Sequence, residues 1–221
     1  MSHSSREVEL KRLLVGPAAA DALIAVLGPV AEHKHQVNHF FDTEDYRLRQ
    51  HHHSVRLRFE DGRPILTAKG PSRALGAHTS ARTEAEATID AKDASLILAG
   101  ARDPVALLRE RATDPAFDEL WTGLERARGE QALRHVGSFE NLRRTVRVVI
   151  EPGLELVVEV DRTQLQDRVD HEVEIEIPDE RRVAAVEAWL EQRAAAAGVE
   201  LAPASTKLAR FYAGRVVVAG G

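Results

Sequence analysis

The stretch Glu7-Val8-Glu9-Leu10-Lys11, near the amino terminus, alternates charged and apolar side chains. In an extended strand, successive side chains point to opposite faces. The two glutamates and the lysine therefore share one face, while Val8 and Leu10 share the other. Taken alone, this pattern is typical of a half-buried strand whose charged face is solvated. It gains meaning only if other strands of the chain repeat it.

Several later stretches do repeat this alternation. The charged positions on these predicted strand faces are Glu7, Glu9, Lys11, Arg56, Arg58, Lys69, Arg82, Glu84, Glu86, Arg143, Arg147, Glu159, Asp161, Glu172, Glu174 and Glu176. The opposite faces are almost uniformly valine, leucine, isoleucine or phenylalanine. A sheet with one wet face explains any single strand, but a solvated face rarely needs arginines two residues apart.

A closed barrel explains the charged faces together. About eight strands close around an interior that side chains can fill or that can hold one small ligand. Helices would then cover the apolar faces on the outside. A charged interior is costly unless its charges are paired or bound to ions. The pattern therefore predicts an α+β fold, a closed eight-stranded antiparallel barrel with helices packed outside.

Turn residues and hydrophobic periodicity predict the order of elements. Strands are expected at 6–14, 35–42, 54–60, 63–69, 80–89, from about 131, and at 143–150, 154–161 and 169–177. Helices are expected at 18–27, 178–197 and from 205, with a helical insertion at about 91–128 in a single domain that covers 1–221. Segments 46–50 and 71–78 are expected to be a connection and a loop, and the apolar segment 216–219 receives no element.

Composition narrows the class of protein. The chain has 221 residues, is 43% hydrophobic and carries a formal charge of -5. The acidic balance argues against a nucleic-acid partner, and the lack of cysteine argues against a disulfide scaffold or a thiolate metal site. A polar start without an apolar run, and no stretch of ~20 apolar residues, favour a cytoplasmic protein with no membrane partner. The expected assembly is a monomer or a homodimer, and the sequence does not choose between them.

The ordered motifs resemble a known family. Glu7 to Lys11 is similar to the ExExK signature of CYTH domains, the triphosphate tunnel metalloenzymes. The resemblance continues, in order, through the stretches at 38–43, 55–58, 66–69, 82–86, 172–176 and 205–207. It implies an eight-stranded antiparallel tunnel that uses Mg2+ or Mn2+ to hydrolyse inorganic, thiamine or nucleoside triphosphates, or to cyclise ATP.

The same resemblance implies roles for individual residues. The implied metal ligands are Glu7, Glu9, Asp161, Glu172, Glu174 and Glu176. The implied phosphate ligands are Lys11, Arg56, Arg58, Lys69, Arg82, Arg143, Arg147 and Lys207. Glu7, Glu9, Lys11 and Glu174 are the implied catalytic group. Guanidinium and ammonium groups neutralise a triphosphate, and hard divalent ions prefer carboxylate oxygen.

Three assignments stay open at this point. Two late glutamates are expected to bind metal, and the chain offers Glu172, Glu174 and Glu176 on one face. Arg144 replaces Arg143 or Arg147 if the strand register moves by one residue, because that shift exchanges faces. Arg82 belongs either to a phosphate site or to an internal salt-bridge ladder. The tract 51–53, three histidines, is read as a polar turn in preference to a metal site.

The predicted activity is divalent-metal-dependent hydrolysis of the terminal phosphate of a small triphosphate, first of all inorganic triphosphate. The alternatives are a thiamine or nucleoside triphosphatase, a class IV adenylyl cyclase, and a module that binds polyphosphate or nucleotide without cleaving it.

Overall fold

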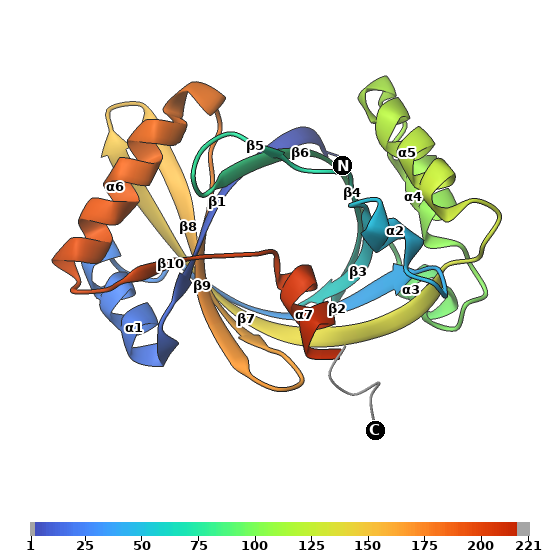
Figure 1. Cartoon of the computed structure of the whole chain (residues 1–221), viewed down its shortest axis with the longest axis horizontal. Helices are drawn as coiled ribbons and strands as arrows, with labels where there is room; N and C mark the ends of the chain where they lie inside the picture. The colour runs from blue at the N-terminus through green and yellow to red at the C-terminus, as the bar shows by residue number, and fades with distance from the viewer. Residues whose placement is uncertain (1–2, 216–221) are drawn as a thin grey trace. The chain divides into compact units, whose positions relative to one another are not determined.

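The computed structural model describes residues 3–215 (Figure 1). The unassigned segment 216–219 lies outside the described residues. The strands are β1 (His3–Leu14), β2 (Glu32–Asp42), β3 (Ser54–Glu60), β4 (Arg63–Lys69), β5 (Arg73–Ala74), β6 (Thr79–Thr88), β7 (Arg134–Glu151), β8 (Leu154–Gln164), β9 (Val169–Glu176) and β10 (Leu201–Pro203). The α-helices are α1 (Gly16–Leu27), α2 (Arg47–Gln50), α3 (Ala91–Leu98), α4 (Pro104–Arg111), α5 (Asp118–Arg128), α6 (Val183–Ala196) and α7 (Lys207–Arg215), and two 3-10 helices are η1 (Pro115–Phe117) and η2 (Glu180–Arg182).

The strand order confirms the predicted barrel. Hydrogen-bonded neighbours follow the order β10-β1-β9-β8-β7-β2-β3-β4-β6-β5, and β1 also pairs with β6. The pairing of β1 with β6 closes a ring of eight strands, to which β10 and β5 are short additions. A closed antiparallel barrel leaves few edge groups unpaired.

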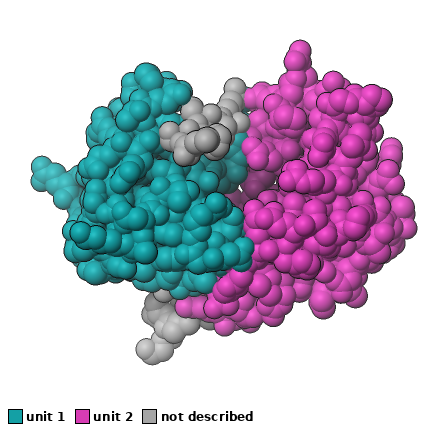
Figure 2. Space-filling view, turned by 180° about the vertical axis from the view of Figure 1, so that it is seen from behind, with its two compact units in different colours: residues 1–7, 36–73, 81–138 teal, residues 8–35, 74–80, 139–221 magenta. Residues whose placement is uncertain are grey.

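Contacts divide the chain into two compact units, coloured separately in Figure 2. Unit 1 comprises Met1–Glu7, Gln36–Arg73 and Ala81–Ser138. Unit 2 comprises Val8–His35, Ala74–Ser80 and Phe139–Gly221.

In unit 1, helices cover the apolar faces of the strands. Leu57 of β3 and Leu66 of β4 are buried in one cluster with Leu108 of α4 and with Trp121 and Leu124 of α5. The helices of 91–128 therefore occur where the periodicity predicts them. They bury the apolar face, so the charged face of β3, β4 and β6 is the one turned away from them.

The segment after β2 differs from the prediction of a plain connection. The carboxylate of Asp42 is buried and accepts hydrogen bonds from three backbone N–H groups, those of Thr43 at 2.7 Å, Leu48 at 2.8 Å and Arg49 at 3.1 Å. These bonds satisfy donors that a short helix leaves open at its start. This carboxylate thereby supports the single turn of α2.

The histidine tract is a turn, as expected, but its last ring is buried. His53 is 8% exposed, and its Nδ1 donates to the carbonyl oxygen of His51 at 2.8 Å. A Cβ at Gly123 of α5 would lie 2.6 Å from His53 Nε2, so the glycine makes room for the ring. Burial lowers the pKa of His53, and the neighbouring His51 and His52 lower it further, which keeps the ring neutral.

Acidification is therefore expected to destabilise unit 1 through His53. A histidine whose folded-state pKa is lowered binds fewer protons than in the unfolded state, so its stabilisation is present above the ordinary value of 6.5 and is lost as the pH falls below it. Thermal unfolding between pH 7.5 and 5.5 should show a loss on the order of 1 kcal/mol. The variant His53→Gln should flatten this slope, whereas the exposed His52→Gln should keep it; equal slopes would contradict the assignment.

In unit 2, α1 and α6 pack against each other, and α1 also packs on β8 and β9. Leu23 of α1 and Leu190 of α6 are buried, as are Val158 of β8 and Ile175 of β9. The charged residues of β8 and β9 alternate with these apolar ones and lie on the other face.

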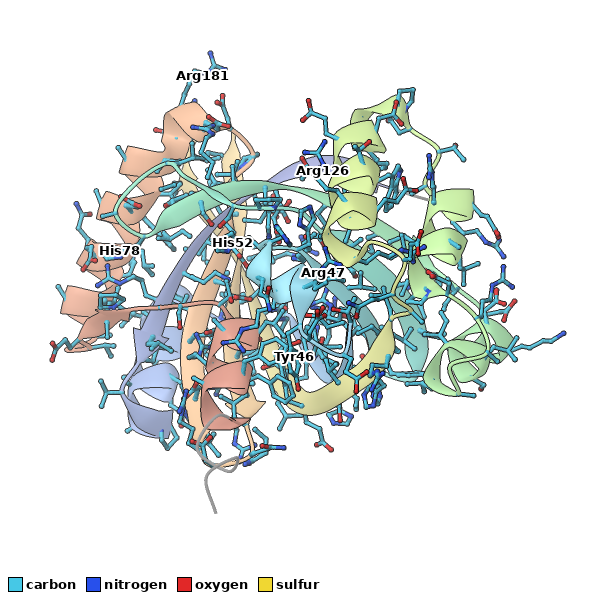
Figure 3. All side chains as sticks on the ribbon, turned by 45° about the vertical axis from the view of Figure 1, so that its right-hand side comes forward. Tyr46, Arg47, His52, His78, Arg126 and Arg181 are labelled. Atoms are coloured by element: carbon cyan, nitrogen blue, oxygen red, sulfur yellow. The ribbon has the colours of Figure 1, made fainter. Side chains whose placement is uncertain are left out.

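The helix predicted from Pro178 begins later. Asp179 caps the 3-10 helix η2, because its side chain accepts a hydrogen bond from the backbone N–H of Arg181 at 2.9 Å. The α-helix α6 begins only after η2, at Val183. The side chain of Arg181 extends away from the ribbon (Figure 3) and is 89% exposed, so its 2.6 Å ion pair with Asp179 is a surface pair.

Within the described residues, no helix is long and apolar enough to cross a bilayer.

Candidate active site

Strand register brings the charged side chains of unit 2 together. Asp161 of β8 lies opposite Glu172 of β9, and Arg143 of β7 lies opposite Asp161. Lys11 of β1 lies opposite Glu174 of β9. Residues that are distant in sequence but share a strand face thereby become neighbours on one patch of sheet.

Three carboxylates form the centre of this patch. Asp161, Glu172 and Glu174 are 1%, 0% and 5% exposed, respectively. One oxygen from each lies within 4.8 Å of the others. Buried carboxylates at this spacing repel one another unless cations are present.

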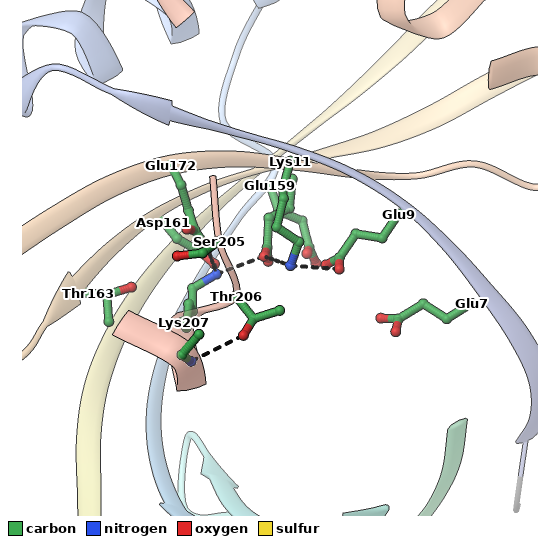
Figure 4. A network of polar contacts seen from close by, with 12 residues as sticks. Glu7, Glu9, Lys11, Glu159, Asp161, Thr163, Glu172, Ser205, Thr206 and Lys207 are labelled. Atoms are coloured by element: carbon green, nitrogen blue, oxygen red, sulfur yellow. Dashed lines mark hydrogen bonds and ion pairs between the residues drawn. The ribbon is translucent and has the colours of Figure 1, made fainter. Parts of the chain in front are cut away.

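Lys207, from the start of α7, contacts all three carboxylates, and Figure 4 shows it beside Asp161 and Glu172. Its Nζ is 2.8 Å from Asp161 Oδ2 and 2.9 Å from Glu174 Oε1, and it also contacts Glu172 Oε1. Burial would lower the pKa of Lys207, but Asp161 and Glu172 outweigh it, so the pKa is raised. The ammonium is therefore fully charged at neutral pH.

Arg143 supplies the second buried cation. It donates through Nε to Asp161 Oδ1 at 2.8 Å and through Nη2 to Asp161 Oδ2 at 2.7 Å, which is a bidentate pair, and Nη2 also reaches Glu174 Oε2 at 2.8 Å. It further pairs with Glu159. Burial would lower the pKa of Arg143, but Asp161 and Glu159 raise it above its ordinary value.

Two more cations complete the patch. Lys11 Nζ lies 2.7 Å from Glu9 Oε2 and 3.2 Å from Glu174 Oε1. Arg210 of α7 pairs with Glu172, and its Nε donates to Asp170 Oδ2 at 2.7 Å. Each carboxylate at the centre therefore faces at least two cationic groups.

These cations set the protonation of the carboxylates. Burial would raise the pKa of Glu174, but Lys207 and Lys11 outweigh it and hold the pKa well below its ordinary value. The pKa of Asp161 is lowered in the same way, by Arg143 and Lys207 against burial. Burial dominates at Glu172, whose pKa is raised, and at Glu159, whose pKa rises to about 7 despite Arg143. Asp161 and Glu174 are therefore ionised at neutral pH.

In unit 1, Glu7 is the centre of a second ion-pair group. Lys69 Nζ lies 3.1 Å from both of its carboxylate oxygens, and Arg82 Nε lies 2.7 Å from Oε2. Lys69 Nζ also lies 2.5 Å from Glu84 Oε2. The side chains of Glu7 and Lys69 are only 18% and 14% exposed, so this charged face is not a solvated exterior.

Two arginines of β3 lie on the same charged face of unit 1. Arg58 Nε donates to the buried Asn38 Oδ1 at 3.1 Å, and Arg56 Nη2 donates to the buried Thr67 Oγ1 at 3.3 Å. The Nε of Arg56 is buried and has no hydrogen-bond partner among the described residues. A guanidinium whose buried Nε–H is unsatisfied offers a donor to an anion.

The structure separates residues that the sequence left equivalent. The side chain of Arg147 is 62% exposed and lies 3.8 Å from Glu155, outside the buried patch. Arg144 pairs at 2.6 Å with Asp21 of α1, on the helix-covered face, so Arg143 is the arginine that faces the carboxylates. Glu176 is exposed at the end of β9, whereas Glu172 and Glu174 are buried. The proposed roles of Arg147 and Glu176 gain no support from these positions.

Sequence reasoning missed Arg210. It lies three residues after Lys207, so both side chains project from one side of a helix, and this spacing was the available signal. Glu159 was recognised as part of a charged strand face but was not assigned to the site. It joins because Arg143 contacts it together with Asp161 and Glu174.

Comparison with known proteins identifies the family. A profile described as the CYTH domain matches residues 5–212. The chain belongs to the CYTH domain family. Among solved CYTH-like structures, HpAC1 from Hippeastrum, an adenylyl cyclase candidate reported to show a dominant triphosphatase activity, is 26% identical with a TM-score of 0.72, and the match covers 94% of this chain and 96% of that one.

Two further relatives have a lower identity or a shorter match. An adenylate cyclase candidate from Bacillus halodurans is 21% identical with a TM-score of 0.66 over 95% of this chain and 98% of that one, which shows a shared fold. The Bacillus subtilis (strain 168) protein named "Putative triphosphatase YjbK" is 32% identical over 66 residues, 30% of this chain and 35% of that relative. The match to this relative therefore spans about a third of its length.

The buried carboxylates of this CYTH chain fit a divalent cation. Mg2+ and Mn2+ are hard ions that prefer carboxylate oxygen, and the three carboxylates present only such oxygens. Glu172 Oε1 is buried and receives no hydrogen bond from the described residues, although Lys207 lies against it. Asp161, Glu172 and Glu174 are therefore the residues that would hold the ion.

Proposed function

We propose that this CYTH protein is a divalent-metal-dependent triphosphatase that removes the terminal phosphate of a small triphosphate, first of all inorganic triphosphate. The observation that carries the proposal is the group of three buried carboxylates in unit 2. The oxygens of the three acids are the ligands that a hard divalent ion prefers, and family membership supplies the reaction class.

Each cluster suits a different kind of ligand by its charge. The cations of unit 1, Arg56, Arg58, Lys69 and Arg82, would bind phosphate oxygens and compensate their charge, since guanidinium forks match phosphate geometry. The carboxylates of unit 2 would hold the divalent ion. When bound, the ion supplies charge compensation and activation of the attacking water. Phosphoryl transfer depends largely on such positioning and electrostatic stabilisation.

The character of the two clusters favours a substrate without an organic half. Their members named above are charged or short and polar, whereas recognition of a base usually involves an aromatic ring on which the base stacks. This supports inorganic triphosphate above ATP or thiamine triphosphate.

A phosphate-release assay tests the proposal. Purified protein is incubated with inorganic triphosphate, ATP or thiamine triphosphate, with Mg2+, with Mn2+ or with EDTA. The expected result is metal-dependent phosphate release that is fastest with inorganic triphosphate. Cyclic AMP formed from ATP would instead identify a cyclase, and tight binding without release would identify a binding module. Absence of turnover with all three substrates would overturn the enzyme assignment.

A further inference from the structure

Helix α7 places a cation at the position that a metal ion would need. The Lys207 ammonium lies 2.8 Å from Asp161 Oδ2 and 2.9 Å from Glu174 Oε1, and it contacts Glu172 Oε1. These are the same three residues whose oxygens lie close enough together to share one ion. The resemblance to CYTH domains assigns Lys207 to phosphate, but in this structure its partners are carboxylates.

Lys207 is also better able to leave its carboxylates than the two arginines of this patch. Arg143 holds Asp161 through two hydrogen bonds and reaches Glu174 with a third interaction. Arg210 is held by Glu172, Asp170 and the carbonyl oxygen of Ser205. An ammonium on a flexible four-carbon chain, by contrast, is a point charge without a fixed hydrogen-bonding fork. Movement of its tip requires only rotamer changes, with α7 remaining in place.

We propose that Lys207 competes with the divalent ion for Asp161, Glu172 and Glu174, and that entry of the ion releases its ammonium for the phosphates of the substrate. This inference rests on the metal site of the proposed function. It gives Lys207 two opposite effects: it weakens metal binding to the free protein, and it strengthens triphosphate binding to the metal-loaded protein. Metal binding would then precede productive substrate binding.

The two effects can be measured separately in the intact chain. Mn2+ binding is followed by the electron paramagnetic resonance signal of free Mn2+ in wild type, Lys207→Met and the control Lys92→Met, whose lysine is exposed on α3 of unit 1. Removal of the competing charge should tighten Mn2+ binding about tenfold or more, within the range typical of coupled sites. Lys92→Met should match wild type.

The second measurement uses the non-hydrolysable analogue imidotriphosphate, titrated calorimetrically at saturating Mn2+. Its affinity for Lys207→Met should fall about tenfold. Thermal unfolding in EDTA checks the fold. Lys207→Gln provides a polar, uncharged second variant, which like Lys207→Met should bind Mn2+ more tightly and imidotriphosphate more weakly than wild type. These opposite shifts separate competition from a structural role, which would weaken both.

The outcomes distinguish this inference from the proposed function. If wild type binds Mn2+ and hydrolyses triphosphate while both Lys207 variants bind Mn2+ no more tightly, the competition is wrong and the triphosphatase assignment stands. If neither wild type nor either Lys207 variant binds Mn2+, the metal site itself is wrong and both fall.

Discussion

Replacing Glu174 with glutamine is expected to reduce metal-dependent triphosphate hydrolysis at least about a hundredfold, because loss of a direct ligand should exceed the 10–100-fold cost typical of outer-sphere changes. Glu174 is buried and contacts Lys11, Lys207 and Arg143. Glutamine keeps the shape of the side chain and removes its charge. Steady-state phosphate release at saturating Mn2+, with thermal unfolding as a check on folding, measures the effect.

Glu176 provides the matched control on the same strand. It lies two residues further along β9, on the same face, but is exposed. Glu176→Gln should therefore retain activity within about threefold of wild type, since surface substitutions seldom perturb a buried site. Equal losses in the two variants would show that the metal ligands extend to the end of β9, and an active Glu174→Gln enzyme would remove Glu174 from the site.

Replacing Arg143 with methionine is expected to lower the free energy of unfolding by about 3–5 kcal/mol, the range for removing one partner of a buried ion pair. The substitution leaves Asp161, Glu174 and Glu159 with one cation fewer in a buried environment. At this chain length the loss corresponds to a fall in Tm of roughly 6–20 °C. Chemical denaturation in EDTA, with wild type in parallel, gives the free energy directly.

Arg147→Met is the control for this stability prediction. Its side chain is 62% exposed, and that of its ion-pair partner Glu155, at 3.8 Å, is 60% exposed. Exposed pairs of this kind contribute about 0–1 kcal/mol, so little change is expected. A loss of comparable size in both variants would contradict the burial argument.

Acid should narrow the gap between wild type and Arg143→Met. The pKa values of Asp161 and Glu174 are lowered, in part by Arg143, so the stabilisation they receive is present above their ordinary values near 4 and is lost as the pH falls through the lower folded-state values. Without Arg143 these carboxylates become protonated more easily. The difference in unfolding free energy should therefore shrink as the pH falls below about 4.

Much of the fold was predictable from periodicity. The alternation in β1, β3 and β9 correctly assigned one charged and one apolar face to each strand, because the pleat places successive side chains on opposite sides. The helices of 91–128 follow from their own apolar spacing. The segment 42–45 was predicted as a turn or helix cap, but 46–50 was predicted as a connection and not as the helix α2. That helix depends on one buried carboxylate, Asp42, that accepts backbone hydrogen bonds.

Local sequence is enough to say which residues share a strand face, and with it the acidic and basic character of that face, because both depend only on the two-residue period of the backbone. Which charged residues of a strand face are buried depends on tertiary structure. Glu176 lies at the end of its strand and is exposed, whereas Glu172 and Glu174 lie beneath the cations of α7. Strand register and the placement of a helix from the far end of the chain are long-range pairings. They are chosen by packing and charge compensation among distant residues, and no local pattern contains them.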